Sequence, residues 1–132
     1  MISIDTNVLV RFLIQDNKEQ CRKIDKILEK CQEKSEIIYV PDLVIIETIW
    51  VLESAYGLKK TEVIEAIGKV LLAAFLEFED LSLLLRTQGY YQSGKADFSD
   101  YYIQCKAQKA GCINLLTFDK AFAQSSSFCK IL

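Results

Sequence analysis

Residues 1–10 read MISIDTNVLV, an apolar run that is interrupted by a carboxylate and then resumes. Residues 2–4 predict a short buried strand, and residues 8–14 have the apolar spacing of a helix. Asp5 lies where the strand gives way to the helix. A carboxylate at such a position either caps the helix or takes part in chemistry. The rest of the chain has to decide between these two roles.

Strands and helices continue to alternate after this first pair. Further strands are predicted at 36–40, 75–79, 113–118 and 128–131, and further helices at 17–34, 42–57, 61–74, 80–93 and 99–111. Strands that alternate with helices and are apolar on both faces are typical of a parallel sheet covered on both sides. We therefore predict one α/β domain over residues 1–132, a three-layer α/β/α sandwich with a mostly parallel sheet of about five strands.

The composition indicates a soluble globular protein. Hydrophobic residues make up 51% of the 132 residues and charged residues 26%. No apolar run approaches the roughly 20 residues that cross a bilayer, so no membrane association is expected. The five cysteines include no CxxC pair, which favours free thiols in a reducing compartment. Because the first residues also lack the features of a signal peptide, we expect a cytoplasmic protein.

The chain contains no histidine, and its net charge is −2. The absence of histidine excludes Ser-His-Asp and Cys-His catalysis and the usual zinc sites that contain histidine. A protein that holds nucleic acid by bulk electrostatics is normally basic. This one can bind a polyanion only through a local patch or through bound cations.

Several acidic side chains are expected at one edge of the predicted sheet. In a parallel α/β sheet, ligands gather at the carboxyl ends of the strands. Asp5 and Asp119 directly follow strands, and Asp97 and Asp100 begin the helix that leads back into strand 113–118. Glu47 lies near the start of the helix over 42–57, with apolar residues one turn away on either side. We therefore expect the Glu47 side chain to point at the covered face of its helix.

Each of these acids also has a structural explanation. Asp5 and Asp119 are plausible N-caps, and Asp97 and Asp100 have the spacing of a capping box. Glu47 is harder to explain. Burying a carboxylate costs several kcal/mol unless the carboxylate is paired or binds a metal. An ion pair with Arg11 or Lys120 is its best structural alternative.

Taken together, the acids favour a divalent cation. Like charges gathered in one place raise one another's pKa values, and a bound cation keeps them ionised. Ligation by oxygen alone suits Mg²⁺ or Mn²⁺ rather than zinc or copper.

The motifs DTNVL at 5–9, ADFSDYYIQCKA at 96–107 and LLTFDKAF at 115–122, with an acid in the third helix, resemble the PIN-domain ribonucleases. Their order and spacing are most similar to the VapC-type toxins of prokaryotic toxin–antitoxin pairs. The resemblance covers essentially the whole chain. It implies a PIN-like α/β/α fold and a Mg²⁺- or Mn²⁺-dependent endoribonuclease that is commonly homodimeric and is inhibited by a VapB-like antitoxin.

Carried over position by position, the family's acidic quartet falls on Asp5, Glu47, Asp100 and Asp119, as metal ligands and catalytic residues. The neighbouring hydroxyl residues match Thr6 and Thr117, and Asp97 is an additional acid whose role as ligand or helix cap stays open. The alternatives are a PIN-like module that binds RNA or a protein partner without cleaving, and a receiver-like phosphoacceptor domain. Receivers need an aspartate at the end of a central strand, and here residues 40–41 are Val-Pro.

Overall fold

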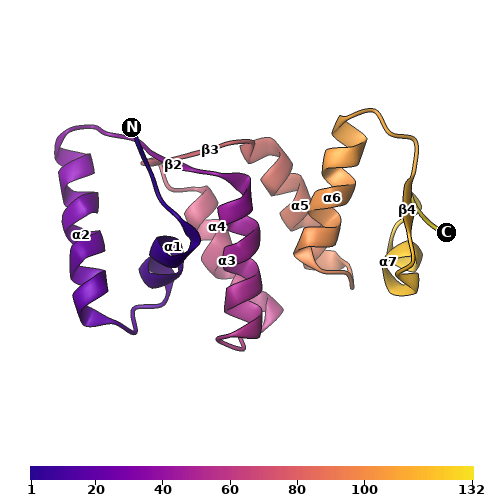
Figure 1. The fold of residues 1–132 in the computed structure, drawn as a ribbon, viewed down its shortest axis with the longest axis horizontal. Helices are drawn as coiled ribbons and strands as arrows, with labels where there is room; N and C mark the ends of the chain where they lie inside the picture. Colours follow the sequence, from indigo (N-terminus) through magenta and orange to yellow (C-terminus); the bar gives the residue numbers. More distant parts are fainter. The chain divides into compact units, whose positions relative to one another are not determined.

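A computed structural model describes residues 1–132 and confirms a mixed α/β fold in which every pair of neighbouring strands is parallel (Figure 1). The chain groups into two parts, Met1–Glu79 and Asp80–Leu132, which are described separately below. The five predicted strands are all present. Three of them form one sheet in the first part, and two form another in the second. The expectation of a single domain over residues 1–132 stays a prediction.

The first part contains four helices and a three-stranded sheet. Its elements in chain order are β1 (Ile2–Ser3), α1 (Thr6–Leu13), α2 (Lys18–Glu33), β2 (Ile38–Val40), α3 (Asp42–Ser54), α4 (Lys60–Leu71) and β3 (Leu76–Phe78). The strand order is β1-β2-β3, with Ile38 of β2 opposite both Ile2 and Leu76. Helix α1 lies between α2 and α3 (Figure 1). The core of this part contains Leu9, Val40, Ile45, Leu52 and Val63, all at most 1% exposed.

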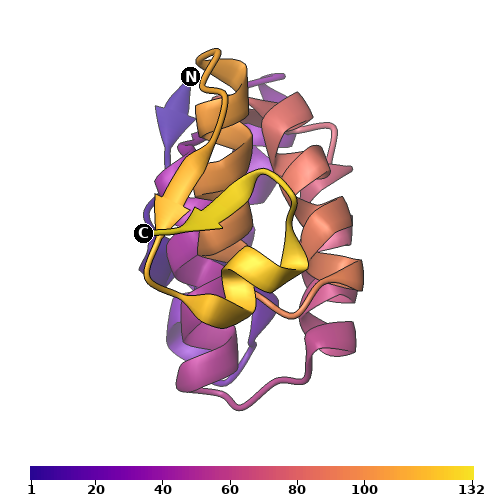
Figure 2. The same ribbon diagram turned by 90° about the vertical axis from the view of Figure 1, so that its right-hand side faces the viewer.

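The second part contains three helices and a two-stranded sheet. Its elements are α5 (Leu81–Ser93), α6 (Phe98–Lys109), β4 (Leu115–Thr117), α7 (Lys120–Ser125) and β5 (Cys129–Ile131). Helices α5 and α6 pack together, and β4 and β5 lie side by side with α7 next to them (Figure 2). Aromatic rings fill the space between helices: Tyr91 meets Phe98 at 5.5 Å, and Tyr101 meets Phe122 at 5.9 Å, edge to face.

Local capping determines where several helices begin. Asn17 accepts a hydrogen bond from the backbone N–H of Gln20 at the start of α2, and Asp80 accepts one from Leu83 at the start of α5, both at 3.0 Å. The helices predicted over 42–57 and 99–111 both end just before a glycine in the structure. Gly57 and Gly111 follow α3 and α6 with φ values of 62° and 86°, a left-handed conformation that favours glycine.

The main differences from the sequence-based elements concern strand length and burial. The strands have two or three residues each, and α7 is a helix that is not among the predicted ones. Residues 2–4 were expected to be buried, yet Ile2 is 37% exposed because β1 is the edge strand of its sheet. Leu116 is 62% exposed, so β4 is not covered on both faces within its own part. All five cysteines are free thiols, and no helix combines the length and apolar character needed to span a bilayer.

Candidate functional site

Two of the predicted site residues meet in the first part. The Thr6 hydroxyl donates a hydrogen bond of 2.6 Å to Oε2 of Glu47, which joins the start of α1 to α3 across 41 residues of sequence. Asp5, the residue before Thr6, is the N-cap of α1 and accepts the Val8 N–H through Oδ1 at 3.0 Å. Capping at Asp5 therefore places Thr6 on the first turn of α1, within reach of Glu47.

The expectation that Glu47 points at a covered face is wrong. Glu47 is exposed, and so are two of its apolar neighbours on the helix, Leu43 at 61% and Trp50 at 68%. The inference failed because α3 is apolar around most of its circumference, so apolar spacing alone does not identify its buried side. The core instead takes Ile45 and Leu52, which are 0% exposed.

The ion-pair explanation for Glu47 is not realised with Arg11. The Arg11 guanidinium donates to Asp16 and to the Tyr56 hydroxyl, both at 2.7 Å, and to Gln20. These contacts hold the pKa of Arg11 above its ordinary value. The hydrogen bond to Tyr56 is the largest cause, and partial desolvation acts in the opposite direction. Arg11 thus ties α1, α2 and the end of α3 together and is engaged away from the acids.

In the second part, the remaining predicted acids lie close to one another. Asp97 is the N-cap of α6, and its backbone N–H donates to Oδ2 of Asp100 at 3.2 Å. Asp119 is the N-cap of α7 and accepts the Phe122 N–H through Oδ1 at 2.9 Å. The Asp119 N–H in turn donates to the Thr117 hydroxyl oxygen at 3.0 Å. Two helix starts and the end of β4 therefore supply the polar groups of this part.

The pKa of Asp100 is raised above its ordinary value. Desolvation by burial is the largest cause, and the negative charges of Asp97 and Asp119 add to it, while the hydrogen bond from the Asp97 backbone acts in the opposite direction. Asp100 is also the one member of the acidic quartet that is half-buried rather than exposed. Repulsion among these carboxylates is what a bound cation would relieve.

Capping does not use up the carboxylates. The four acids of the quartet are Asp5, Glu47, Asp100 and Asp119. Each has one carboxylate oxygen that accepts a hydrogen bond, from the Thr6 hydroxyl in Glu47 and from a backbone N–H in the three aspartates, and one oxygen that makes no hydrogen bond. None of them forms a salt bridge with lysine or arginine. The structural and chemical explanations of these acids are therefore compatible, since a capping aspartate retains one free oxygen.

The free oxygens fit a hard divalent cation. Mg²⁺ in proteins usually takes about one or two carboxylates and completes its shell with water and substrate phosphate. Two acids of the quartet, Asp5 and Glu47, lie in the first part, where Thr6 next to Asp5 bonds Glu47; the other two, Asp100 and Asp119, lie in the second part, where the charge of Asp119 acts on Asp100. In neither part do three or more acidic or cysteine side chains form a group that could hold a metal. A cation would therefore need water or phosphate as additional ligands.

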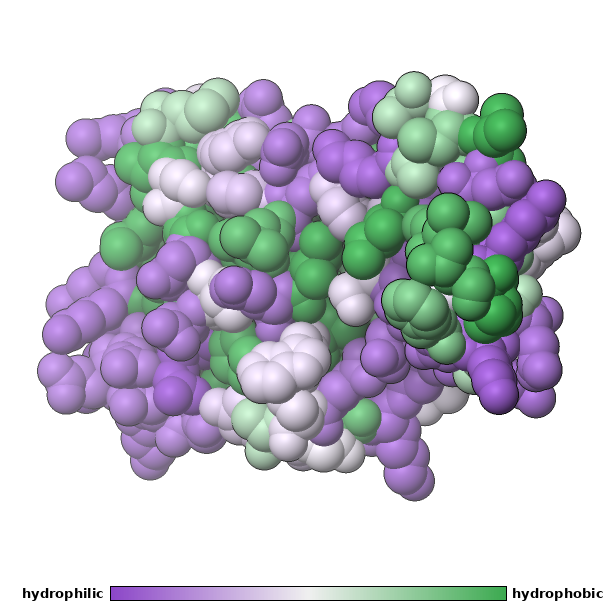
Figure 3. Space-filling view, turned by 45° about the vertical axis from the view of Figure 1, so that its right-hand side comes forward, coloured by the Kyte–Doolittle hydropathy of each residue, from purple (hydrophilic) through white to green (hydrophobic).

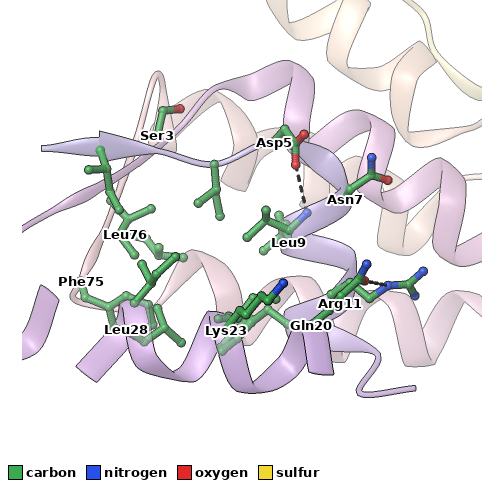
Figure 4. A pocket seen from close by; sticks show the side chains of 17 residues that line it. Ser3, Asp5, Asn7, Leu9, Arg11, Gln20, Lys23, Leu28, Phe75 and Leu76 are labelled. Carbon is green, nitrogen blue, oxygen red and sulfur yellow. Dashed lines mark hydrogen bonds between the residues drawn. The ribbon is translucent and has the colours of Figure 1, made fainter. Parts of the chain in front are cut away.

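A pocket of about 630 Å³ opens beside Asp5 in the first part (Figure 4). Its walls are mostly apolar and come from α1, α2 and the sheet; they include Val8, Phe12, Ile24, Leu28 and Phe75. Asp5 and Asn7 lie on one side of the pocket, and Arg11 and Lys23 lie on another. This mostly apolar lining does not suit a charged phosphodiester. Although Asp5 lies at its side, the pocket therefore differs in polarity from the surroundings of the other acids.

A further acidic group was not singled out from the sequence. The pKa of the Tyr39 hydroxyl is raised above its ordinary value. Desolvation by burial is the largest cause, and the nearby negative charges of Glu79, Asp42 and Glu77 add to it. Asp42 is only 1% exposed, and its backbone N–H donates to Oε2 of Glu79 at 3.1 Å. The signal that would have indicated this group is the run EFED at 77–80, which places Glu77 and Glu79 at the end of the predicted strand 75–79 and Asp80 directly after it.

Comparison with known proteins begins with protein families. Residues 2–126 match the family model described as PIN domain, which is nearly the entire chain. This match agrees with the order of the acidic motifs along the sequence.

Two individual proteins are similar to this chain. The chain is 27% identical over 119 residues to a protein of Aquifex aeolicus (strain VF5) named VapC ribonuclease, covering 90% of this chain and 87% of the relative. Among solved structures, it is similar to Mycobacterium tuberculosis VapC20, described as a toxin that cleaves the Sarcin-Ricin loop. That similarity has a TM-score of 0.45 and 15% identity, and it covers 96% of this chain and 95% of the other.

Proposed function

This chain belongs to the PIN-domain family, and from that premise we propose that it is a Mg²⁺- or Mn²⁺-dependent endoribonuclease, acting as the toxin of a toxin–antitoxin pair. The relative named VapC ribonuclease, which matches along most of both chains, supports RNA as the substrate. The absence of histidine is consistent with a mechanism that relies on carboxylates and a metal.

The observation that carries this proposal is the hydrogen bond between Thr6 and Glu47. It brings two separate motifs, the acid–hydroxyl pair after β1 and the acid of α3, into contact. A hydrogen bond from a neighbouring group is also how carboxylates that bind metals are oriented in proteins. The bond orients Glu47 and leaves its Oε1 free.

In the proposed mechanism, Asp5, Asp100 and Asp119 hold the cation through their free oxygens. When bound, Mg²⁺ or Mn²⁺ lowers the pKa of a water ligand and neutralises negative charge on the phosphate during in-line displacement. Glu47, held by Thr6, orients the attacking water or contributes a further ligand. The Thr117 oxygen already accepts the Asp119 N–H, so its hydroxyl hydrogen is available to donate to a phosphate oxygen.

The direct test is cleavage of a fluorogenic single-stranded RNA with Mg²⁺ or Mn²⁺ and with excess EDTA. We expect cleavage only with metal, and its loss in Asp100→Asn and Asp119→Asn. Asp25→Asn, which removes an exposed acid of α2, is the matched control and is expected to cleave as wild type does. RNA binding without metal-dependent cleavage would instead identify the non-catalytic module.

We further propose that the protein acts in the cytoplasm, forms a homodimer and is inhibited by a VapB-like antitoxin. Support for the cytoplasm comes from the five free thiols. Exposed apolar side chains on α5 and α6, namely Leu85, Tyr90 and Ile103, offer contact area to a protein partner. Light scattering would measure the oligomeric state. Co-expression with the product of the neighbouring reading frame would test the antitoxin, which is expected to suppress cleavage.

A further inference from the structure

The single tryptophan of the chain is exposed next to a proposed catalytic acid. Trp50 is 68% exposed on α3, three residues after Glu47, so the two side chains are neighbours on the helix surface. Its backbone carbonyl accepts the Ser54 hydroxyl at 2.6 Å, while the indole lies in solvent. Exposing an indole beside a carboxylate gives up the hydrophobic gain that usually places tryptophan in a core.

A second exposed ring lies next to another acid of the quartet, in the second part. Phe118 is 80% exposed and lies between Thr117 and Asp119. The hydrogen bond from the Asp119 N–H to the Thr117 hydroxyl closes a tight turn around Phe118 and holds its backbone in place. Apolar side chains gather at the right of Figure 3. Other exposed apolar residues of this part include Leu116 and Leu132.

The exposed aromatic rings are therefore not scattered at random over the surface. Three aromatic side chains count among the exposed large hydrophobic residues, namely Trp50, Tyr90 and Phe118. The two most exposed of these are the two that lie beside acids of the quartet. A ring in such a position is suited to stack against a flat, apolar surface carried by the substrate.

The charge of the protein indicates why stacking is needed. Its net charge is −2, and Arg11 and Lys109 are already paired with Asp16 and Asp80. A surface of this kind cannot obtain most of its RNA affinity from phosphate contacts. Base stacking on aromatic rings provides about 1–3 kcal/mol per base without requiring positive charge.

We propose that Trp50 and Phe118 are stacking platforms, each for an unpaired base of the RNA, Trp50 beside Glu47 and Phe118 beside Asp119. This proposal rests on the ribonuclease activity proposed above and names two residues that position its substrate. Bases in a duplex have their faces covered by their neighbours, whereas unpaired bases can stack on a protein ring.

Trp50 makes the test direct, because it is the only source of tryptophan fluorescence. A mixed-sequence single-stranded RNA of twelve nucleotides is titrated in Mg²⁺ into the Asp5→Asn variant, which keeps three of the four acids and is expected not to cleave. We expect saturable quenching of Trp50 emission by this RNA, and none by the same sequence annealed to its complement. Trp50→Ala, with binding followed by RNA anisotropy, is expected to raise Kd about 5- to 150-fold.

Matched variants separate stacking from general damage to the fold. Trp50→Phe and Phe118→Tyr keep a ring and are expected to bind within about threefold of the parent, whereas Phe118→Ala weakens binding over the same range as Trp50→Ala. Leu43→Ala removes another exposed apolar side chain from the same helix and is expected to leave Kd unchanged. Circular dichroism identifies any variant that fails to fold.

Several outcomes would overturn the inference. An unchanged Kd in both alanine variants, or quenching of the same size by the duplex, excludes stacking while leaving the ribonuclease proposal intact if cleavage is observed. A shift from dimer to monomer in Trp50→Ala at unchanged Kd assigns the ring to a second copy of this chain. If wild type neither cleaves nor binds any RNA, the proposed function itself fails.

Discussion

At the scale of single residues, the capping role seen for the acids is compatible with the metal-binding role proposed for them. Asp5 and Asp119 cap α1 and α7 through one oxygen each, and the second oxygen stays available for a cation. A helix N-terminus carries partial positive charge, which favours a carboxylate there and tolerates its ionised form. The position that makes an aspartate a good cap therefore also presents an ionised ligand.

The two roles of Asp5 are separable by mutation. Asn caps a helix about as well as Asp, so Asp5→Asn is expected to change the free energy of unfolding of the metal-free protein by less than about 0.5 kcal/mol while abolishing cleavage. Asp5→Ala loses the cap as well and is expected to cost about 1 kcal/mol. Urea denaturation in EDTA and the RNA assay measure the two effects. A loss of several kcal/mol in Asp5→Asn would indicate a structural role instead.

The raised pKa of Asp100 predicts how metal-free stability depends on pH. In the folded protein Asp100 binds its proton more tightly than in the unfolded chain, whose pKa is near 3.8. Between pH 3.8 and the raised pKa, the unfolded chain has lost the Asp100 proton while the folded protein still tends to hold it. The contribution of Asp100 to the free energy of unfolding therefore decreases as the pH rises through this window. Asp100→Asn removes this loss. Relative to wild type, the variant is expected to gain stability across that window, measured by urea denaturation in EDTA.

The same shift predicts the pH dependence of metal binding. A proton and a cation compete for the Asp100 carboxylate, so Mn²⁺ affinity is expected to rise with pH through the raised pKa. Calorimetric titration with Mn²⁺ at several pH values measures this dependence. In Asp25→Asn, the exposed-acid control, the dependence is expected to stay as in wild type.

At the scale of elements, short strands and capped helices place the polar groups. Strands of two or three residues provide little stability by themselves, so much of the stability has to come from helix packing. In the second part, this packing centres on Tyr101, which is 1% exposed and contacts the rings of Tyr90 and Phe122. Its hydroxyl also accepts the Ala96 N–H, just before the start of α6.

Gly94, which follows α5, tests how tightly this packing is built. A Cβ at residue 94 would overlap the Tyr101 hydroxyl and lie 2.9 Å from the Tyr90 carbonyl oxygen. Gly94→Ala is therefore expected to reduce the free energy of unfolding by about 1–3 kcal/mol. Gly89→Ala is the matched control, because a Cβ there meets nothing within 4 Å inside α5, and it is expected to be neutral or to stabilise by up to about 1 kcal/mol. Thermal unfolding distinguishes the two.

At the scale of the whole molecule, low charge governs how RNA can be held. The net charge is −2, and the sequence pI is near 5.2. Because its 18 acidic residues outnumber its 16 basic ones, we expect the proposed association with RNA to depend on bound divalent ions and on stacking rather than on a broad basic surface.

A shallow salt dependence is the corresponding prediction. For single strands, log K falls with log salt by about 0.7 per phosphate neutralised, so a protein that contacts only one or two phosphates through lysine or arginine gives a slope of about −1. Kd for the twelve-nucleotide RNA, measured in Asp5→Asn at fixed Mg²⁺ over a range of KCl, tests this expectation. A slope steeper than about −4 would reveal a basic surface that contributes far more than the composition indicates.

The sequence by itself determined the alternation of strands and helices, the parallel pairing of strands, the helix stops at Gly57 and Gly111, and the order of the acidic motifs. These features follow from local periodicity, from backbone conformations that favour glycine, and from motif spacing, all of which are present before the chain folds. The joint placement of all four acids around a cation stays a prediction.

Only the tertiary structure decided which side of α3 is buried, that Glu47 is exposed and bonded to Thr6, and that Arg11 is engaged with Asp16 and Tyr56. A helix that is apolar on most sides contains no record of which side its neighbours will cover. The partner of an ionisable side chain likewise depends on residues that are distant in sequence and become close only on folding.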